Sequence, residues 1–168
     1  RLLTGSTLLF GGTANGAALG DCWEWTGSSW SQLPSGPPAR HSAALAEDLA
    51  RGEIVLFGGS TGGLAANTVL ADTWIFRGAT WSRRVTPGPS ARADAGMAFD
   101  LERGQMVLFG GRRGANVADN FADTWSWNGS GWTQLVTPNT PPPFTAPSVQ
   151  SSLARGRVLL SGTASGGV

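Results

Sequence analysis

Two landmarks recur along this chain at an interval of 51 residues, and this repetition constrains the fold more than any other feature. The first landmark is an Asp-x-Trp motif, which begins at Asp21, Asp72 and Asp123. The second is a later tryptophan, which stands at Trp30, Trp81 and Trp132. A Gly-Gly pair precedes each copy at intervals of 47 and 52 residues, at positions 11–12, 58–59 and 110–111. The repeats therefore differ in length mainly between Gly-Gly and Asp-x-Trp.

Each repeat contains four short segments with the composition of β-strands. The first follows a loop rich in Pro, Ala and Arg, the second is an apolar run that ends on Gly-Gly, the third carries Asp-x-Trp, and the fourth begins at the later tryptophan. First strands are expected at 42–46, 95–99 and 149–153, and second strands at 7–10, 54–57, 106–109 and 158–160. Third strands are expected at 23–25, 74–76 and 125–127. Short glycine-containing connections, at 51–52, 103–104, 155–156, 26–29, 77–80 and 128–131, predict antiparallel hairpins.

The composition agrees with an all-β chain and excludes several classes of partner. Charged residues are only 14% of the sequence, beside 25 glycines and 10 prolines, as expected for many short strands joined by turns. The net charge of +1 provides no basic field for nucleic acid. No apolar run approaches the roughly 20 residues that cross a bilayer, so no membrane span is expected. The single cysteine, Cys22, stands where the other repeats have threonine, which indicates a small side chain in a strand.

Side-chain size changes across each repeat as a wedge-shaped sheet requires. The first strands carry small residues, as at 43–44 and 95–96, whereas the later strands carry tryptophan and phenylalanine. A β-propeller blade needs this taper, because its innermost strand is crowded at the axis and its outer strands fill the space between blades. The tryptophans could alternatively stack on sugars, but their recurrence in phase favours packing between blades. The predicted fold is therefore all-β, with four antiparallel strands in each propeller blade.

These residues resemble kelch repeats. Phe-Gly-Gly, the Asp-x-Trp motif with a second aromatic residue, a glycine and the later tryptophan match the kelch pattern at 8–32, 55–83 and 107–134. Pro38 and Arg40 match the Pro-x-Arg that introduces the next blade. Kelch repeats usually have tyrosine in the third strand, where this chain has Trp25, Phe76 and Trp127. The resemblance is closest to the Trp-rich form common in bacterial secreted and surface proteins, so it implies an extracellular or cell-surface location.

The whole chain, 1–168, is expected to be a single segment of such a propeller. Its blade portions are 1–33, 38–84, 90–135 and 144–161, of which the second and third contain all four strands. Propellers usually have about 4–8 blades, so the roughly three blades here are expected to form an open or partial ring. That ring is either part of a larger one or a half-ring that assembles, and self-association is expected through open blade edges. The last portion departs from the pattern, with Phe144 where Arg40 and Arg92 stand.

Functional residues are expected where second strands connect to third strands and where fourth strands connect to first strands, because these loops share one face of a propeller. The loops are 13–20, 60–71 and 112–122, together with 34–41, 86–94 and 137–147. They differ in length and sequence while the opposite turns are uniform, and such loops commonly carry function. The resemblance also implies that ligands bind on this face. The candidate ligand-binding residues are Arg40, His41, Asn67, Arg92, Asp94, Arg112, Arg113, Asn116 and Asp119.

Some in-phase polar residues also have a structural interpretation. The aspartates that begin the third strands are expected to accept hydrogen bonds from backbone N–H groups. Arg40 and Arg92 recur in phase, which favours a structural role for them too. They stay binding candidates because kelch rings often present arginines near this position.

The sequence offers no constellation typical of a catalytic site. His41 is the only histidine and there is no tyrosine, so neither a His/Cys metal centre nor any other cofactor site is expected. The copper oxidase built on kelch blades and the sialidase-type propellers both depend on tyrosine. The sequence therefore predicts a non-catalytic binding module for a protein or a glycan. The alternative is a scaffold segment of a larger kelch-type enzyme, an oxidase or a carbohydrate-active enzyme, whose catalytic residues lie outside this chain.

Overall fold

The structure, a computed structural model, describes residues 5–62, 68–152 and 155–164. In these residues it is all-β: thirteen strands form four antiparallel sheets, and the only helix is one 3-10 turn, η1 (Val117–Asp119). Every sheet is a meander in which strands that follow one another in the sequence are hydrogen-bonded neighbours. Tight turns that contain glycine join most of these neighbours, whereas the longer segments 58–72 and 110–123 join second to third strands in the two complete repeats. The predicted all-β class is therefore confirmed.

Sheets 2 and 3 correspond to the two complete repeats, and sheets 1 and 4 are smaller. Sheet 1 consists of β1 (Thr7–Ala14), β2 (Ala17–Trp25) and β3 (Trp30–Leu33). Sheet 2 consists of β4 (Ala44–Asp48), β5 (Glu53–Phe57), β6 (Thr73–Arg77) and β7 (Thr80–Arg84). Sheet 3 consists of β8 (Gly96–Asp100), β9 (Gln105–Phe109), β10 (Thr124–Trp127) and β11 (Trp132–Leu135). Sheet 4 consists of β12 (Phe144–Ser152) and β13 (Arg157–Ala164).

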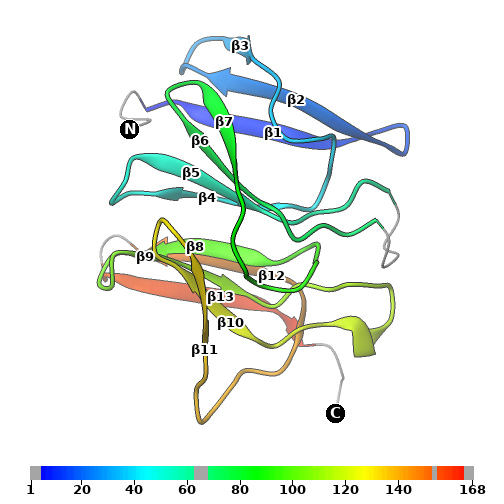
Figure 1. The fold of residues 1–168 in the computed structure, drawn as a ribbon, viewed down its shortest axis with the longest axis vertical. Coiled ribbons are helices and arrows are strands. Elements are labelled where there is room, and N and C mark those ends of the chain that lie inside the picture. Colours follow the sequence, from blue (N-terminus) through cyan, green and yellow to red (C-terminus); the bar gives the residue numbers. More distant parts are fainter. Residues whose placement is uncertain (1–4, 63–67, 153–154, 165–168) are drawn as a thin grey trace.

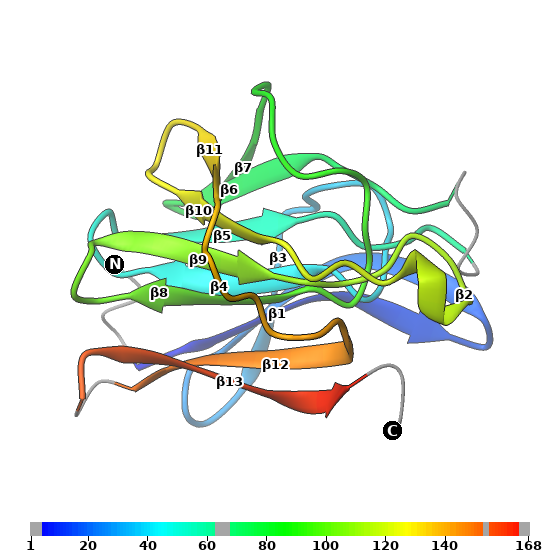
Figure 2. The ribbon, with the colours of Figure 1, turned by 90° about the horizontal axis from the view of Figure 1, so that it is seen from below.

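The sheets follow one another along the long axis of the molecule, from sheet 1 at the top of Figure 1 to sheets 3 and 4 at the bottom. The first strands of neighbouring repeats lie side by side, because β8 contacts β4 on one side and β12 on the other. Figure 2 shows the β12–β13 hairpin as a separate layer next to β8. The described sheets do not close into a ring.

The core lies between sheets and contains the apolar strands that the sequence predicts. Every residue of β5 and of β8 is buried. Trp132 of sheet 3 packs on Phe57 of sheet 2 with ring centroids 5.3 Å apart, and Trp81 of sheet 2 packs on Phe10 of sheet 1 at 5.2 Å. These two tryptophans therefore pack between sheets, as their recurrence in phase predicted.

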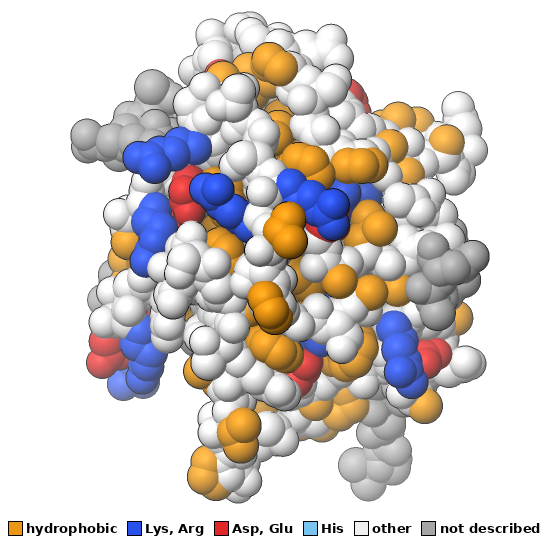
Figure 3. Space-filling view, in the orientation of Figure 1, with side chains coloured by type: hydrophobic (Ala, Val, Ile, Leu, Met, Phe, Trp, Pro, Cys, Tyr) orange, Lys and Arg blue, Asp and Glu red, His pale blue; other side chains and the backbone are white. Residues whose placement is uncertain are grey.

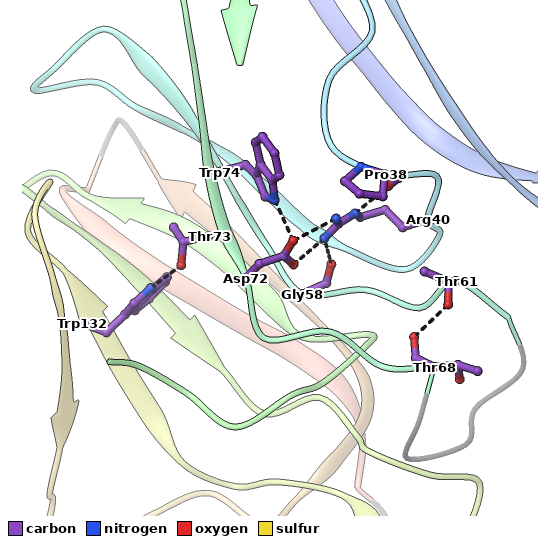
Figure 4. Close-up of polar contacts among 9 residues, drawn as sticks. All are labelled: Pro38, Arg40, Gly58, Thr61, Thr68, Asp72, Thr73, Trp74 and Trp132. Atoms are coloured by element: carbon purple, nitrogen blue, oxygen red, sulfur yellow. Dashed lines mark hydrogen bonds and ion pairs between the residues drawn. The ribbon is translucent and has the colours of Figure 1, made fainter. Parts of the chain in front are cut away.

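The two tryptophan contacts differ in one polar detail. Trp132 Nε1 donates a hydrogen bond across the sheets to the Thr73 hydroxyl at 2.9 Å (Figure 4). Between sheets 2 and 1 the residue in phase with Thr73 is the fully buried Cys22, and the buried Nε1 of Trp81 makes no hydrogen bond. Burial raises the pKa of the Cys22 thiol, and the nearby Trp81 N–H opposes that rise by a smaller amount. Because sulfur is a weak acceptor, Cys22 occupies the place of threonine without its hydrogen bond.

Two predicted loops are partly strand. β1 continues to Ala14 and β2 begins at Ala17, so the predicted loop 13–20 is a hairpin with Asn15-Gly16 as its turn. Both turn residues have positive φ, 51° and 80°, as in a two-residue type I′ turn. Likewise β12 begins at Phe144, inside the predicted loop 137–147. The small residues around these ends show no apolar alternation, which is why the sequence does not reveal the extra strand length.

Candidate functional site

The connections from second to third strands and from fourth to first strands gather on one side of the molecule, at the right of Figure 1. The tight β4–β5 and β8–β9 turns lie on the other side. Beside sheets 2 and 3, isolated β-bridges hold the connections together, pairing His41 with Ser60, Ser60 with Val69, Ala93 with Arg112 and Arg112 with Asn120. The described residues of 34–43, 58–72, 86–95 and 110–123 are called the loop face below. All the described candidate residues lie in this part of the chain.

Arg40 is the centre of a buried hydrogen-bond network in sheet 2 (Figure 4). Its side chain is 1% exposed. Nη1 and Nη2 donate to the two carboxylate oxygens of Asp72 at 2.6 and 3.0 Å, and Nη1 also donates to the Gly58 carbonyl at 3.0 Å. Nε donates to the Pro38 carbonyl at 3.0 Å, and Trp74 Nε1 donates to the same carboxylate at 2.6 Å. Because its donors point into this network, Arg40 is not accessible to a ligand in this structure.

Arg92 makes the same network in sheet 3 and is equally buried. It donates to both carboxylate oxygens of Asp123 at 2.6 and 2.9 Å, and to the equivalent glycine carbonyl at 2.9 Å. Trp125 Nε1 donates to this carboxylate at 2.7 Å. The sequence predicted that backbone N–H groups would donate to these aspartates. In the structure, side chains of arginine and tryptophan donate to them instead. Arg92, like the arginine in sheet 2, holds the structure together and is withdrawn from the surface.

These contacts determine the ionisation of the two aspartates. Burial on its own would raise the pKa of Asp72 and Asp123. Hydrogen bonds from arginine and tryptophan, together with the arginine charge, outweigh burial and hold both pKa values below the ordinary aspartate value. Both carboxylates are therefore ionised at neutral pH and pair with arginine in the bidentate geometry that favours charge-assisted hydrogen bonds.

Each buried arginine also connects two sheets. The Arg40 backbone N–H donates to the Leu19 carbonyl at 2.9 Å, and its carbonyl accepts from the Gly12 N–H at 3.0 Å, so its main chain is held by sheet 1. Arg92 makes the equivalent two backbone hydrogen bonds to sheet 2. A methyl group at Gly58 would overlap the Arg92 carbonyl oxygen, and Gly58 has a φ of +67°. The Gly-Gly motif of one repeat and the arginine of the next are therefore two halves of one inter-sheet connection.

Asp21 has the equivalent place in sheet 1 but no arginine partner among the described residues. Its Oδ2 accepts a hydrogen bond from Trp23 Nε1, as the equivalent aspartates do in sheets 2 and 3. Its Oδ1 is buried and has no hydrogen-bond partner. Sequence reasoning treated the three aspartates alike. The in-phase position of the arginines was the signal that could have separated Asp21 from the other two.

Arg112 and Asp94 form a partly exposed ion pair on the loop face. Arg112 Nε donates to Asp94 Oδ2 at 2.8 Å. The Asp94 backbone N–H donates to the Ser42 carbonyl at 2.9 Å, which joins the loop beside sheet 3 to the loop beside sheet 2. The structure therefore brings two predicted site residues together and orients both.

Arg113 and Asp119 form a second pair beside η1. Arg113 Nε donates to Asp119 Oδ1 at 3.3 Å, and Asp119 Oδ2 accepts from the Asn116 backbone N–H at 3.3 Å. The Arg113 side chain is 60% exposed, which makes it the most accessible arginine among the described candidates. With this exposure the Arg113 side chain is open to a ligand.

His41 joins the same face through both ring nitrogens. Nε2 lies 2.7 Å from the Gly62 carbonyl oxygen, and Nδ1 lies 3.1 Å from the Ser42 hydroxyl. A carbonyl oxygen only accepts, so Nε2 donates to it. His41 therefore positions the start of its neighbouring loop. The remaining candidate, Asn67, lies outside the described residues.

Charge is balanced across the loop face. Its four arginines each have an aspartate partner at 3.3 Å or less: Arg40, Arg92, Arg112 and Arg113. Figure 3, which has the loop face at its right edge, shows arginine side chains in separate groups on the face in view, several beside acidic side chains. Such a surface is suited to hydrogen bonding with a polar ligand of low charge rather than to a polyanion.

The described residues lack a metal-ligand cluster and a membrane-crossing helix. They contain no group of three or more His, Cys, Asp or Glu side chains placed to hold a metal ion. None of their helical structure has the length and apolarity needed to cross a membrane. The chain matches no protein-family model, and no curated protein matches it significantly.

Proposed function

We propose that the chain is a non-catalytic binding module whose loop face holds a protein or a glycan. The observation that carries the proposal is the contrast between a repeated scaffold and unrepeated loops. The ion pairs of Arg112 and Arg113 have no counterpart beside sheet 2, where Ser60 and Thr61 take the equivalent positions. Residues that recur in every repeat are explained by packing, whereas residues particular to one loop are free to serve recognition.

The scaffold supports a kelch-like β-propeller as the parent fold. Four-stranded meanders, first strands that lie side by side and tryptophans stacked between sheets are properties of propeller blades. In this proposal sheets 2 and 3 are complete blades and sheets 1 and 4 are partial ones. An extracellular or cell-surface location belongs to the same proposal, through the resemblance to bacterial kelch-type repeats.

The chemistry of the loop face favours a glycan over a protein. Paired guanidinium and carboxylate groups present oriented donors and acceptors to hydroxyl groups without a net charge. Hot spots of protein interfaces are enriched in tryptophan and tyrosine as well as in arginine, and the loop face offers arginine alone of these. Trp30 and Leu49 are exposed outside the loop face, whereas Val85, which is 92% exposed, directly precedes its 86–95 segment.

The test compares the wild-type chain with Arg113→Ala and with Arg77→Ala. Arg77 is an exposed arginine at the end of β6, away from the loop face, and so controls for loss of one positive charge. On an array of neutral and acidic oligosaccharides, the wild type and Arg77→Ala are expected to bind the same glycans saturably. Arg113→Ala is expected to bind about tenfold more weakly with an unchanged Tm, as for the loss of one charged hydrogen bond of about 1.5 kcal/mol.

Equal weakening in both variants, or none in Arg113→Ala, would contradict the loop face as the binding surface. If the wild type binds no oligosaccharide on the array, a glycan is excluded as the ligand class.

A further inference from the structure

The chain contains two Asn-Gly dipeptides, Asn15-Gly16 and Asn128-Gly129, and each lies in a hairpin turn. Asparagine followed by glycine is open to deamidation, because the glycine has no side chain to keep its nitrogen from the asparagine Cγ. In this reaction the glycine nitrogen attacks Cγ and ammonia leaves. The two dipeptides differ in the surroundings of the asparagine side chain and in backbone conformation, so the structure separates them.

The Asn128 side-chain oxygen lies among three hydrogen-bond donors. Oδ1 accepts from the backbone N–H groups of Ser130 and Gly131, both at 3.0 Å, and from the Ser130 hydroxyl at 2.9 Å. A backbone N–H only donates, so the accepting atom is the oxygen rather than the amide nitrogen. Attack on Cγ places negative charge on this oxygen, and donors that already point at it stabilise that charge. The turn 128–131 therefore has the arrangement of an oxyanion hole for the first step of deamidation.

The attacking nitrogen and the leaving amide are also accessible. Asn128 is exposed, and the Gly129 N–H makes no backbone hydrogen bond to a described residue. Water can therefore take the proton of that N–H, and no hydrogen bond has to break before the nitrogen attacks.

Asn15 is held in a conformation that opposes the same reaction. Its φ of +51° is in the left-handed region, whereas Asn128 has the ordinary negative φ. In the left-handed conformation the side chain and the next nitrogen lie on nearly opposite sides of the Cα–C bond, so the nitrogen cannot reach Cγ until the backbone rotates. The paired strand ends Ala14 and Ala17 on either side of this two-residue turn restrict that rotation.

We propose that Asn128 is a site of spontaneous deamidation in the folded chain and that Asn15 is protected. The Gly129 nitrogen gives up its proton and forms a bond to Asn128 Cγ, and the Cγ–Nδ2 bond breaks as ammonia leaves. Solvent water then opens the cyclic imide at either carbonyl carbon, which gives aspartate or isoaspartate without any oxidation. The turn lies at the opposite end of sheet 3 from the loop face, so this inference is independent of the proposed function.

The two products have different consequences for the fold. Aspartate keeps an oxygen for the N–H groups of the turn, whereas isoaspartate carries the main chain through Cγ and adds one carbon to its backbone. The turn directly joins Trp127 to Trp132, whose ring centroids are 5.4 Å apart, and Trp132 packs on Phe57 of sheet 2. Isoaspartate at this position is therefore expected to loosen the contact between sheets 2 and 3.

The test incubates the folded chain at mildly alkaline pH and follows each asparagine by mass spectrometry of proteolytic peptides, which also distinguishes isoaspartate from aspartate. Asn128 is expected to convert at least about tenfold faster than Asn15, the factor that one hydrogen bond to a charged group provides. In urea the two sites are expected to convert at similar rates, because neither turn persists. Ser130→Ala is expected to slow conversion of Asn128 about tenfold in the folded chain, because one donor to the charged oxygen is lost.

Two further variants complete the test. Asn128→Gln is expected to abolish conversion at this turn, because its ring closure is less favourable, and to leave the rate at Asn15 unchanged. Asn128→Asp is expected to keep the Tm of fresh wild-type chain, whereas aged wild-type chain that contains isoaspartate melts lower.

Conversion of Asn15 as fast as Asn128 in the folded chain would overturn the proposal. So would conversion of Asn128 in urea but not in the folded chain, since the turn would then protect the residue. A rate in Ser130→Ala that equals or exceeds the wild-type rate would remove the role of the oxyanion donors. An unchanged Tm of the aged chain would show that isoaspartate leaves the contact between sheets 2 and 3 intact.

Discussion

Replacing Asp72 by asparagine removes the negative charge that neutralises Arg40. The arginine stays buried in this variant, because its backbone is held by sheet 1 and its other donors by carbonyl groups. Asparagine offers one acceptor oxygen in place of two and turns an amide N–H₂ toward a guanidinium donor. Removing one partner from a buried ion pair costs about 3–5 kcal/mol of folding free energy. The Asp72 side chain is 14% exposed, so water offsets part of the loss and about 3 kcal/mol is expected.

Asp21→Asn is the matched control, because it removes the same charge where no arginine is bound. The asparagine oxygen can still accept the Trp23 hydrogen bond, and the variant no longer buries an unpartnered carboxylate oxygen. Its stability is expected to lie within about 1 kcal/mol of wild type.

Urea unfolding followed by the fluorescence of the 8 tryptophans measures both variants. In urea the m-value is expected to stay unchanged while the midpoint falls. In thermal unfolding, a loss of about 3 kcal/mol in a chain of 168 residues corresponds to a fall in Tm of roughly 6–12 °C. If Asp72→Asn stays within about 1 kcal/mol of wild type, or Asp21→Asn is equally destabilised, neutralisation of buried arginine is not what holds these sheets together.

Three further outcomes are expected. Cys22→Thr gives the Trp81 N–H an oxygen acceptor and should stabilise the chain by about 0.5–1.5 kcal/mol in urea unfolding, whereas Cys22→Val should not. Gly58→Ala should destabilise the chain by clearly more than Gly104→Ala. Both glycines have a positive φ, but no atom lies within 4 Å of a methyl group added at Gly104, so this control should lose only about 1–2 kcal/mol of folding free energy. The lowered pKa values of the two arginine-paired aspartates make their stabilisation complete above the ordinary aspartate pKa of about 3.9. The urea midpoint should therefore fall as pH drops below about 4 through those lowered values, and less so when both aspartates are asparagine.

The loop face shows how far sequence reasoning reached for the candidate site. The antiparallel strand order correctly indicated which connections share one side of the molecule. The state of each candidate could not be read in the same way. Arg40 and Arg113 are both loop arginines in the sequence, yet one is buried and the other is 60% exposed. Side-chain burial depends on neighbouring sheets, which local sequence patterns do not describe.

The sequence by itself determined the all-β class, the order of the strands and the packing of Trp81 and Trp132 between sheets. These features depend on glycine turns, apolar runs and in-phase recurrence, all of which are local or repeated. Only the tertiary structure decided which charged groups neutralise each other, because Arg40 and Asp72 lie 32 residues apart and meet only when the strands of sheet 2 are assembled. For the same reason it alone showed that Asp21 is left with a buried, unpartnered oxygen.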